Sequence, residues 1–278
     1  MNQWDEPSSS ILPIRPGVGL ANRIRGAVAP QLSVVIPAFN EAARIGPYLA
    51  AIRDYLDSTY PHETEVLVVD DGSRDGTANL VERIADGWPA LRLIRHELNR
   101  GKGAAIRTGV LAACGRRILF ADADGATPIE EERRLAIALA NGAAVAAASR
   151  YLPDVGVSRE RNLRRGTAGV VFRWLAKRLV GVGVQDTQCG FKMFEADAAK
   201  TLFEASSETG YLLDLEVLAL AKRFGFPVAE VAVNWSEKPG SKVRIVRDSV
   251  RMFAGLWRLR RRVRTVPAPD RVVEARAA

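Results

Sequence analysis

Cysteine is scarce in this sequence. The two cysteines, Cys114 and Cys189, are far apart and show neither the spacing of a disulfide framework nor that of metal ligands, so they predict a reducing compartment and exclude a cysteine-based metal site. No apolar run reaches the ~18 residues of a membrane-spanning helix. The first ten residues lack the basic-then-apolar order of a signal peptide. We therefore expect a cytoplasmic protein that does not span a membrane.

Two further patterns are missing. No self-similarity with the period of a solenoid is present, which excludes a repeat architecture. The Gly101-Lys102-Gly103 stretch lacks the full spacing of a P-loop, which disfavours a P-loop ATPase.

The composition that is present suits one large α/β domain. The chain has 278 residues, of which 47% are hydrophobic, and its formal net charge is +8. This length can bury a sizeable core. The positive charge favours acidic partners, which include nucleic acid, anionic lipid headgroups and phosphorylated substrates.

Strand and helix patterns alternate through the first half of the chain. Apolar runs predict buried strands at residues 32–36, 66–69, 91–94, 117–121 and 143–149. Helical spacing of apolar residues predicts helices at residues 45–56, 77–86, 104–113 and 129–140. This alternation predicts a mostly parallel, doubly wound sheet with helices on both faces. Later segments predict helices at 170–180 and 212–224 and a strand at 228–235.

Differences in composition and residue pattern also divide the chain into four segments. Residues 1–30 are rich in proline, glycine and serine and predict a flexible arm. Residues 31–243 carry the α/β pattern. Residues 244–264 predict an amphipathic helix with an arginine cluster, and residues 265–278 predict a disordered tail.

The most informative stretch is Asp122-Ala123-Asp124, which directly follows a buried strand. Ligands of open α/β sheets bind at the carboxyl ends of the strands. If the chain stays extended, one carboxylate can reach a ribose and the other a divalent cation, for which Mg²⁺ and Mn²⁺ suit carboxylate oxygens. Taken alone, an Asp-x-Asp pair more often caps the next helix. Here several polar turns meet at one sheet edge, which favours a metal and nucleotide-sugar site.

Other polar groups leave two interpretations open. Asp70-Asp71 ends a strand and suits either a nucleoside or a solvated turn, and Lys102 suits either an anion or solvent. Asp214 and Glu216 lie two apart on one helix, so they do not share a helical face, and a role for one is favoured over a role for both. A solvated pair is the alternative for them.

Basic segments point to phosphate or membrane. The arginines of the loop at residues 158–165 suit an acceptor phosphate or plain solvent, and they are Arg159, Arg161, Arg164 and Arg165. The last helix suits a membrane interface with anionic lipid, because Val246, Val250, Phe253, Leu256, Trp257 and Leu259 share one face. An ordinary packed helix is the alternative.

Six ordered motifs carry a family resemblance. They are Val34–Glu41, Val69–Ser73, Asn99–Gly103, Asp122–Asp124, Gln188–Lys192 and Pro239–Lys242. Together they resemble a family 2 glycosyltransferase with the Rossmann-like GT-A fold, from about Leu32 to Arg262. Within that family the chain is similar to dolichyl-phosphate β-glucosyltransferases. The resemblance implies inverting, metal-dependent transfer of a hexose, with UDP-glucose as the favoured donor, to a polyprenyl phosphate, by an enzyme peripheral on the cytoplasmic face of the inner membrane.

The resemblance also implies roles for residues. Nucleoside contacts fall on Pro37, Phe39, Glu41, Val69 and Asp71, and further substrate contacts on Lys102, Gln188, Lys192 and Glu216. Asp122, Ala123 and Asp124 would hold ribose, diphosphate and Mg²⁺ or Mn²⁺, and Arg150 and Lys242 would bind phosphate groups. Catalysis is assigned to Asp122, Asp124, Asp214 and Lys242. Some relatives have a glutamine metal ligand where this chain has Ala126, so the expected coordination shell lacks one ligand.

Three alternatives stay open at this point. One is a mannosyl or other hexosyl transferase that uses GDP-mannose, and another is a transferase with a soluble acceptor. The third is a sugar-nucleotide-binding regulatory protein without catalysis. No role in nucleic-acid binding is expected, and the sequence does not indicate an oligomeric state.

Overall fold

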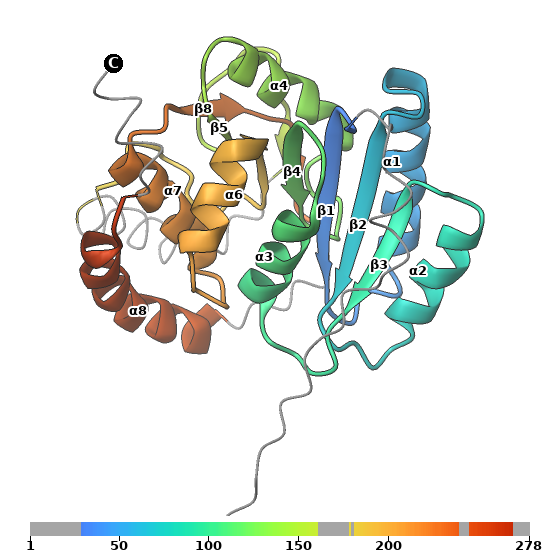
Figure 1. Cartoon of the computed structure of the whole chain (residues 1–278), viewed down its shortest axis with the longest axis horizontal. Coiled ribbons are helices and arrows are strands. Elements are labelled where there is room, and N and C mark those ends of the chain that lie inside the picture. The colour runs from blue at the N-terminus through green and yellow to red at the C-terminus, as the bar shows by residue number, and fades with distance from the viewer. Residues whose placement is uncertain (1–28, 161–177, 179–180, 239–244, 269–278) are drawn as a thin grey trace, which may run out of the picture.

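The computed structural model describes residues 29–160, 178, 181–238 and 245–268. A seven-stranded mixed sheet lies between two layers of helices (Figure 1). Its strand order is β3-β2-β1-β4-β7-β5-β8. The strands are β1 (Leu32–Ala38), β2 (Thr64–Asp70), β3 (Leu91–Arg95), β4 (Arg117–Ala121), β5 (Val145–Ser149), β7 (Phe191–Glu195) and β8 (Val228–Ala232). The predicted mostly parallel α/β sheet is confirmed.

Each face of the sheet has its own hydrophobic core. Buried side chains of α1 (Ile45–Thr59), α2 (Thr77–Asp86) and α4 (Glu132–Ala140) cover one face. Those of α3 (Lys102–Ala112), α6 (Ala196–Ala205), α7 (Leu213–Phe224) and α8 (Ile245–Thr265) cover the other. Burial on both faces explains why the strand sequences are continuous apolar runs rather than alternating ones.

The first helices form because their apolar residues recur once per turn. In α1, Ile45, Leu49, Ile52 and Leu56 are all buried. The predicted helix at 129–140 begins as a 3₁₀ turn, η1 (Ile129–Glu131), and continues as α4. The predicted strand at 228–235 is split into β8 and the short β9 (Trp235–Ser236), which pairs with β6 (Arg159–Glu160).

One strand of the seven-stranded sheet is absent from the sequence prediction. β7 runs antiparallel between β4 and β5, with Ala121 opposite Phe191 and Ala147 opposite Lys192. Its sequence, Phe-Lys-Met-Phe-Glu, carries a lysine at a fully buried position. Because of this lysine, the segment lacks the continuous apolar run by which a core strand is recognised in a sequence.

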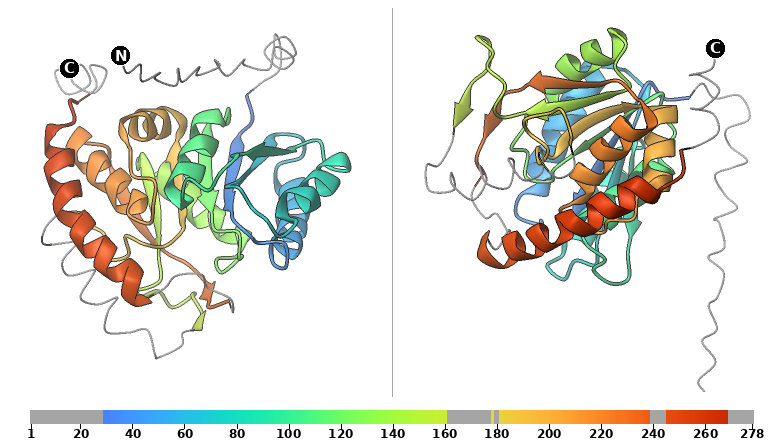
Figure 2. Two further views of the ribbon diagram at one scale, coloured as in Figure 1. Left: turned by 90° about the horizontal axis from the view of Figure 1, so that it is seen from below. Right: turned by 90° about the vertical axis from the view of Figure 1, so that its left-hand side faces the viewer.

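The C-terminal helix α8 lies beside α7 on the outside of the molecule (Figure 2). Leu256, Leu259 and Val263 are buried in the core, whereas Trp257 is 59% exposed. The sequence analysis placed Leu256, Trp257 and Leu259 on one face, and that assignment is wrong because the two leucines pack inward. None of the helices in the described ranges is both long and apolar enough to cross a membrane.

Several sequence predictions lie outside the described residues. These are the flexible arm up to residue 28, the helix at 170–180 apart from Arg178, and the tail from residue 269. Arg161, Arg164, Arg165 and Lys242 lie outside them as well.

Candidate active site

The ends of five strands meet at one edge of the sheet. β1, β2 and β4 are parallel neighbours, so Phe39, Asp71 and Asp122 follow their carboxyl ends at the same edge. β7 is antiparallel and therefore starts at this edge, next to Gly190, and β5 ends there before Arg150. Along the chain, β2 and β3 are added on one side of β1 and β4 is added on the other, so the strand order switches between β1 and β4. Such a switch point is where open α/β sheets bind their ligands.

Asp122 is held between Lys102 and Gly190. The Nζ of Lys102 lies 2.6 Å from Oδ1 of Asp122, and the Asp122 amide donates to the Gly190 carbonyl at 3.0 Å. A Cβ at position 190 would collide with the Asp122 carboxylate, so a larger residue there would displace it. Burial opposes the charge of Lys102, but the nearby Asp122, Asp214 and Asp124 carboxylates outweigh it and raise its pKa. Lys102 is thus a fixed cation and not an exposed lysine.

Asp124 lies in a tight turn and not in an extended segment. Gly125 has φ +63°, and a Cβ there would press on the ring of Tyr48. The Ala126 amide donates to Oδ1 of Asp124 at 3.1 Å. Asp124 therefore closes its own turn, and within the described part of the chain no side chain caps η1 or α4. The helix-cap interpretation of this motif is wrong.

Tyr48 closes the site from below the turn. Its hydroxyl donates to the Thr127 carbonyl at 3.3 Å. Burial, and then the negative charges of Asp122 and Asp124, raise its pKa well above the usual value. Tyr48 therefore remains neutral beside the two aspartates. The sequence analysis counted it only as part of a helix.

The carboxylates suit a divalent cation whose remaining ligands come from elsewhere. Asp122 and Asp124 offer hard oxygen donors, and the Asp122 side chain is 37% exposed. In the ranges that the structure covers, no group of three His, Cys, Asp or Glu side chains could hold a metal ion. Mg²⁺ commonly binds through one or two carboxylates together with water and substrate phosphates. The residues fit such a cation, and Ala126 (9% exposed) adds no side-chain ligand.

Asp71 organises the turn before Lys102. It is 2% exposed, and its carboxylate accepts hydrogen bonds from the amides of Arg100 at 2.9 Å and Gly101 at 2.8 Å. The Nδ1 of His96 lies 2.7 Å from its Oδ1. The solvated-turn interpretation is therefore wrong. Sequence analysis missed His96, which no motif marks.

The other predicted nucleoside contacts lie on β1, on β2 and in the segment that follows β1. Pro37 lies opposite Val69 in the pairing of β1 and β2, and both are buried. Phe39 and Glu41 follow β1 and are partly exposed. The Glu41 carboxylate forms an ion pair with Arg44 at 2.6 Å. Ala123, between the two aspartates, is 5% exposed.

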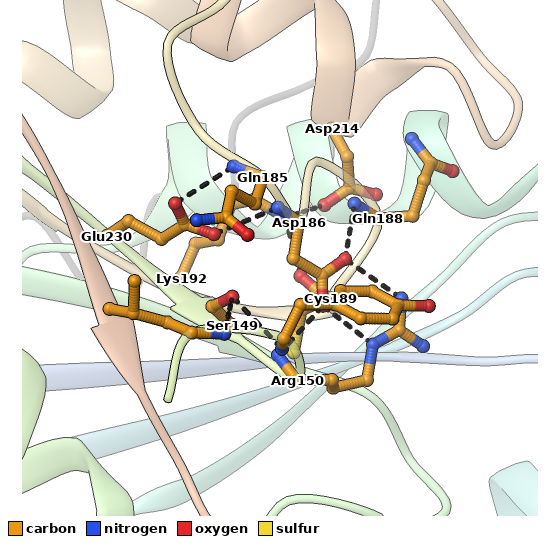
Figure 3. Close-up of polar contacts among 11 residues, drawn as sticks. Ser149, Arg150, Gln185, Asp186, Gln188, Cys189, Lys192, Asp214 and Glu230 are labelled. Carbon is orange, nitrogen blue, oxygen red and sulfur yellow. Dashed lines mark hydrogen bonds and ion pairs between the residues drawn. The ribbon is translucent and has the colours of Figure 1, made fainter. Parts of the chain in front are cut away.

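Arg150 is tied to Asp186 (Figure 3). Its Nε and Nη2 donate to the Asp186 carboxylate at 2.8 and 2.9 Å, and its amide donates to the same group at 2.9 Å. Burial disfavours the Asp186 charge, but the bonds and charge of Arg150 prevail and lower the pKa of Asp186. Arg150 also lies over the rings of Tyr151 and Trp235. Its guanidinium therefore fixes a loop, and its predicted phosphate contact stays a prediction.

The loop at residues 185–190 is held at both ends. The carboxylate of Glu230 accepts from the amides of Gln185 and Asp186 at 2.8 and 2.9 Å. Two atoms within the loop, Thr187 Oγ1 and Gln188 Nε2, are buried and have no hydrogen-bond partner among the described residues. A buried polar atom without a partner is costly in free energy. Sequence analysis missed Asp186 and Glu230, whose partners lie far away along the chain.

Lys192 and Asp214 form a buried ion pair. The Lys192 Nζ lies 2.5 Å from Oδ1 of Asp214 and also donates to the Cys189 carbonyl. Lys192 has no exposed surface and Asp214 is 4% exposed. Burial raises the pKa of Cys189 to about 12, so its thiol stays protonated. The interpretation of Asp214 and Glu216 as a solvated pair is wrong, since Glu216 is 1% exposed.

Comparisons with known proteins agree with this geometry. The switch-point site with its Asp-x-Asp turn fits the GT-A glycosyltransferase fold that the sequence predicts. The sequence profile of glycosyl transferase family 2 matches residues 33–203. The chain belongs to glycosyl transferase family 2 and is a glycosyltransferase.

Curated relatives and solved structures extend this result. The chain is 34% identical over 240 residues to a dolichyl-phosphate beta-glucosyltransferase of Dictyostelium discoideum, covering 82% of this chain and 73% of that one. It is 35% identical over 252 residues to the enzyme of the same name from Homo sapiens, with coverages of 82% and 78%.

The fold also matches glucosyl-3-phosphoglycerate synthase of Mycobacterium tuberculosis, solved with Mn²⁺, uridine diphosphate and phosphoglyceric acid. The TM-score is 0.61 at 20% identity, with coverages of 87% and 80%. Mannosyl-3-phosphoglycerate synthase of Rubrobacter xylanophilus matches with a TM-score of 0.60 at 22% identity, over 87% and 78% of the two chains. These likenesses show the GT-A fold.

Proposed function

We propose that this protein is an inverting glucosyltransferase that moves glucose from UDP-glucose to a polyprenyl phosphate of the dolichyl phosphate kind. The observation that carries the proposal is the identity of 34–35% over 82% of the chain to enzymes named for glucosyl transfer to dolichyl phosphate. The fixed Lys102–Asp122 pair at the switch point supports it, because a nucleoside diphosphate needs cationic and metal-binding groups at this place.

Different residues at this edge of the sheet are proposed to hold different parts of the donor. Asp71, Pro37, Phe39, Glu41 and Val69 are proposed to hold the nucleoside. Lys102 offers its Nζ to the diphosphate, and Asp122 and Asp124 would hold Mg²⁺ or Mn²⁺. Such a cation, when bound, stabilises negative charge on the departing diphosphate.

The acceptor phosphate already carries an anionic oxygen that can attack the sugar. Strong general-base help is therefore unnecessary, and positioning and charge neutralisation dominate. Asp214 is held by Lys192 and is proposed to orient the substrate, as is Gln188. Arg150 and Lys242 are proposed to neutralise phosphate charge.

A transfer assay with matched donors tests this function. Purified protein is given UDP-glucose or GDP-mannose, a polyprenyl phosphate and Mg²⁺ or Mn²⁺, and lipid-linked product is measured. We expect product with UDP-glucose and none in the presence of a chelator. The Asp122→Asn, Asp124→Asn double variant should lose at least ~100-fold in kcat/KM.

Other outcomes would contradict the proposal. Product from GDP-mannose alone would make the enzyme a mannosyltransferase, and transfer to a soluble phosphorylated acceptor would replace the lipid. Nucleotide-sugar binding with no transfer to any acceptor would indicate a regulatory protein.

We also propose that the outer face of α8 lies on a membrane, as expected for a protein with a lipid-linked acceptor. Trp257 is exposed, and the Arg260 guanidinium lies 5.9 Å from the centre of its ring. Arg258, Arg261 and Arg264 are exposed on the same helix. An aromatic side chain among arginines suits an anionic interface.

Liposome sedimentation tests the membrane contact. The Arg260→Glu, Arg261→Glu double variant should bind anionic vesicles at least ~10-fold more weakly, while its affinity for UDP stays unchanged. Unchanged sedimentation would contradict the proposal.

A further inference from the structure

The segment at residues 206–211 lies directly against the start of α3. The Ala104 amide donates to the Thr209 carbonyl at 3.2 Å. A Cβ at Gly103 would come within 2.8 Å of the carbonyls of Glu208 and Gly210, and one at Gly101 would collide with that of Thr209. The two glycines that flank Lys102 therefore allow this segment to approach the start of α3. Its position sets the position of Lys102.

Glu216 holds this segment in place. It lies in the first turn of α7 and is 1% exposed. Its Oε2 accepts hydrogen bonds from the amides of Ser207 at 3.0 Å and Glu208 at 2.8 Å. A buried carboxylate that accepts two amides is a strong anchor, because charge-assisted hydrogen bonds are about twice as strong as neutral ones.

The second oxygen of Glu216 faces the C-terminal helix. Oε1 is buried and has no hydrogen-bond partner among the described residues. The Nε of Arg262 on α8 lies 3.5 Å from it, and Nη2 of Arg262 is 3.5 Å from the Ala205 carbonyl. Since a buried carboxylate needs a nearby opposite charge, Arg262 is the partner that balances the carboxylate anchoring the segment.

We propose that Glu216 is a positioning residue for Lys102 and that Arg262 supports it from α8. The chain of contacts runs from Arg262 to Glu216, to the amides of Ser207 and Glu208, to the start of α3, and so to the Lys102–Asp122 pair. In this role Glu216 acts on Lys102 through the backbone and not through a contact with the substrate. This role rests on the proposed function only in that Lys102 binds the donor diphosphate.

A double-mutant cycle tests this route. Glu216→Gln should lower kcat/KM for the donor between ~10- and 100-fold, mainly through KM, because small misplacements of binding groups are costly. Lys102→Met should lose more. If Glu216 acts through Lys102, the combined variant should lose no more than Lys102→Met alone. Multiplied losses would overturn the proposal.

Hydrogen exchange gives a readout that does not depend on activity. In Glu216→Gln, the amides of residues 101–105 and 207–208 should exchange at least ~10-fold faster, while those of α1 stay unchanged. Unchanged exchange at residues 101–105 would overturn the proposal even if no donor is turned over. A uniform rise across all helices would also overturn it, because that is general destabilisation.

Two variants complete the design. Glu204→Gln changes an exposed glutamate on α6 and is the matched control, for which no change is expected. Arg262→Gln should show the same pattern as Glu216→Gln with a smaller amplitude. If the wild type proves to use another donor, the proposed function fails, and the exchange result still decides the role of Glu216.

Discussion

The two halves of the site edge hold their carboxylates in different ways. In the N-terminal half, backbone amides bind Asp71 and Asp124, His96 also lies beside Asp71, and the partly exposed Asp122 is paired with Lys102. In the C-terminal half, Asp186 and Asp214 are bound by the side chains of Arg150 and Lys192, and these pairs are largely buried. Amides belong to the fold of the loop, whereas a charged partner is a single side chain. The C-terminal half therefore depends more strongly on individual residues.

This difference fits the expected tasks of the two halves. Turns built from backbone amides have a fixed shape, which suits the binding of a nucleotide. Buried ion pairs cost free energy to desolvate, and removing one partner is far more costly than replacing both. Charge deletions in each half are therefore a direct test of the comparison.

The largest effect is expected at Lys192. Lys192→Met leaves the Asp214 carboxylate buried without its cation and should lower the free energy of unfolding by about 3–5 kcal/mol. Urea denaturation measures this, and Lys238→Met, at an exposed position, is the control. The Lys192→Met, Asp214→Leu double variant should regain most of the loss. A stable single variant would show that the ion pair does not hold this half together.

An intermediate effect is expected at Asp186. Its folded-state pKa is lowered, so it stabilises the fold above the ordinary carboxyl pKa, and this stability is lost as pH falls through the folded value. Asp186→Asn should cost about 1.5–3 kcal/mol at pH 7. Its unfolding free energy should also decline less steeply below pH ~4. Urea titrations from pH 3 to 7 check this. If the unfolding free energy of the wild type and of Asp186→Asn falls equally steeply with pH, the Arg150–Asp186 pair does not cause the loss of stability in acid.

The smallest effect is expected at Asp71. In Asp71→Asn the carbonyl oxygen can still accept from one of the amides of Arg100 and Gly101, but the NH2 group cannot accept from the other, and the loss should be about 1–2 kcal/mol. Thermal or urea unfolding measures it. A cost above that of Lys192→Met would reverse the comparison between the two halves.

Sequence reasoning predicted the N-terminal half well because each of its motifs is local. A strand, its polar turn and the next helix are adjacent in the chain, so Asp71, Lys102 and Asp122 could be brought to one edge by the rules of parallel sheets. The argument that Asp214 and Glu216 face different surroundings was also local, and the structure separates them.

The C-terminal half of the site was not predicted because the residues that contact one another there are far apart in the sequence. Arg150 and Asp186, or Asp186 and Glu230, are linked only through the pairing of β5 with β7 and β8. Periodicity cannot reveal such partners. A lysine inside a core strand gave a misleading signal, since Lys192 is buried only because Asp214 lies beside it.

The antiparallel strand β7 has a consequence for how the chain folds. Strands β1 to β4 join through successive crossovers, whereas β7 pairs with β4 only after the chain from Ala121 to Phe191 has closed on itself. Closure of a long loop is slow because its entropy is lost before the contacts form. We expect the nucleotide half to assemble early, and the loop with Asp186 and Gln188 to reach the edge in a late step that makes the enzyme competent.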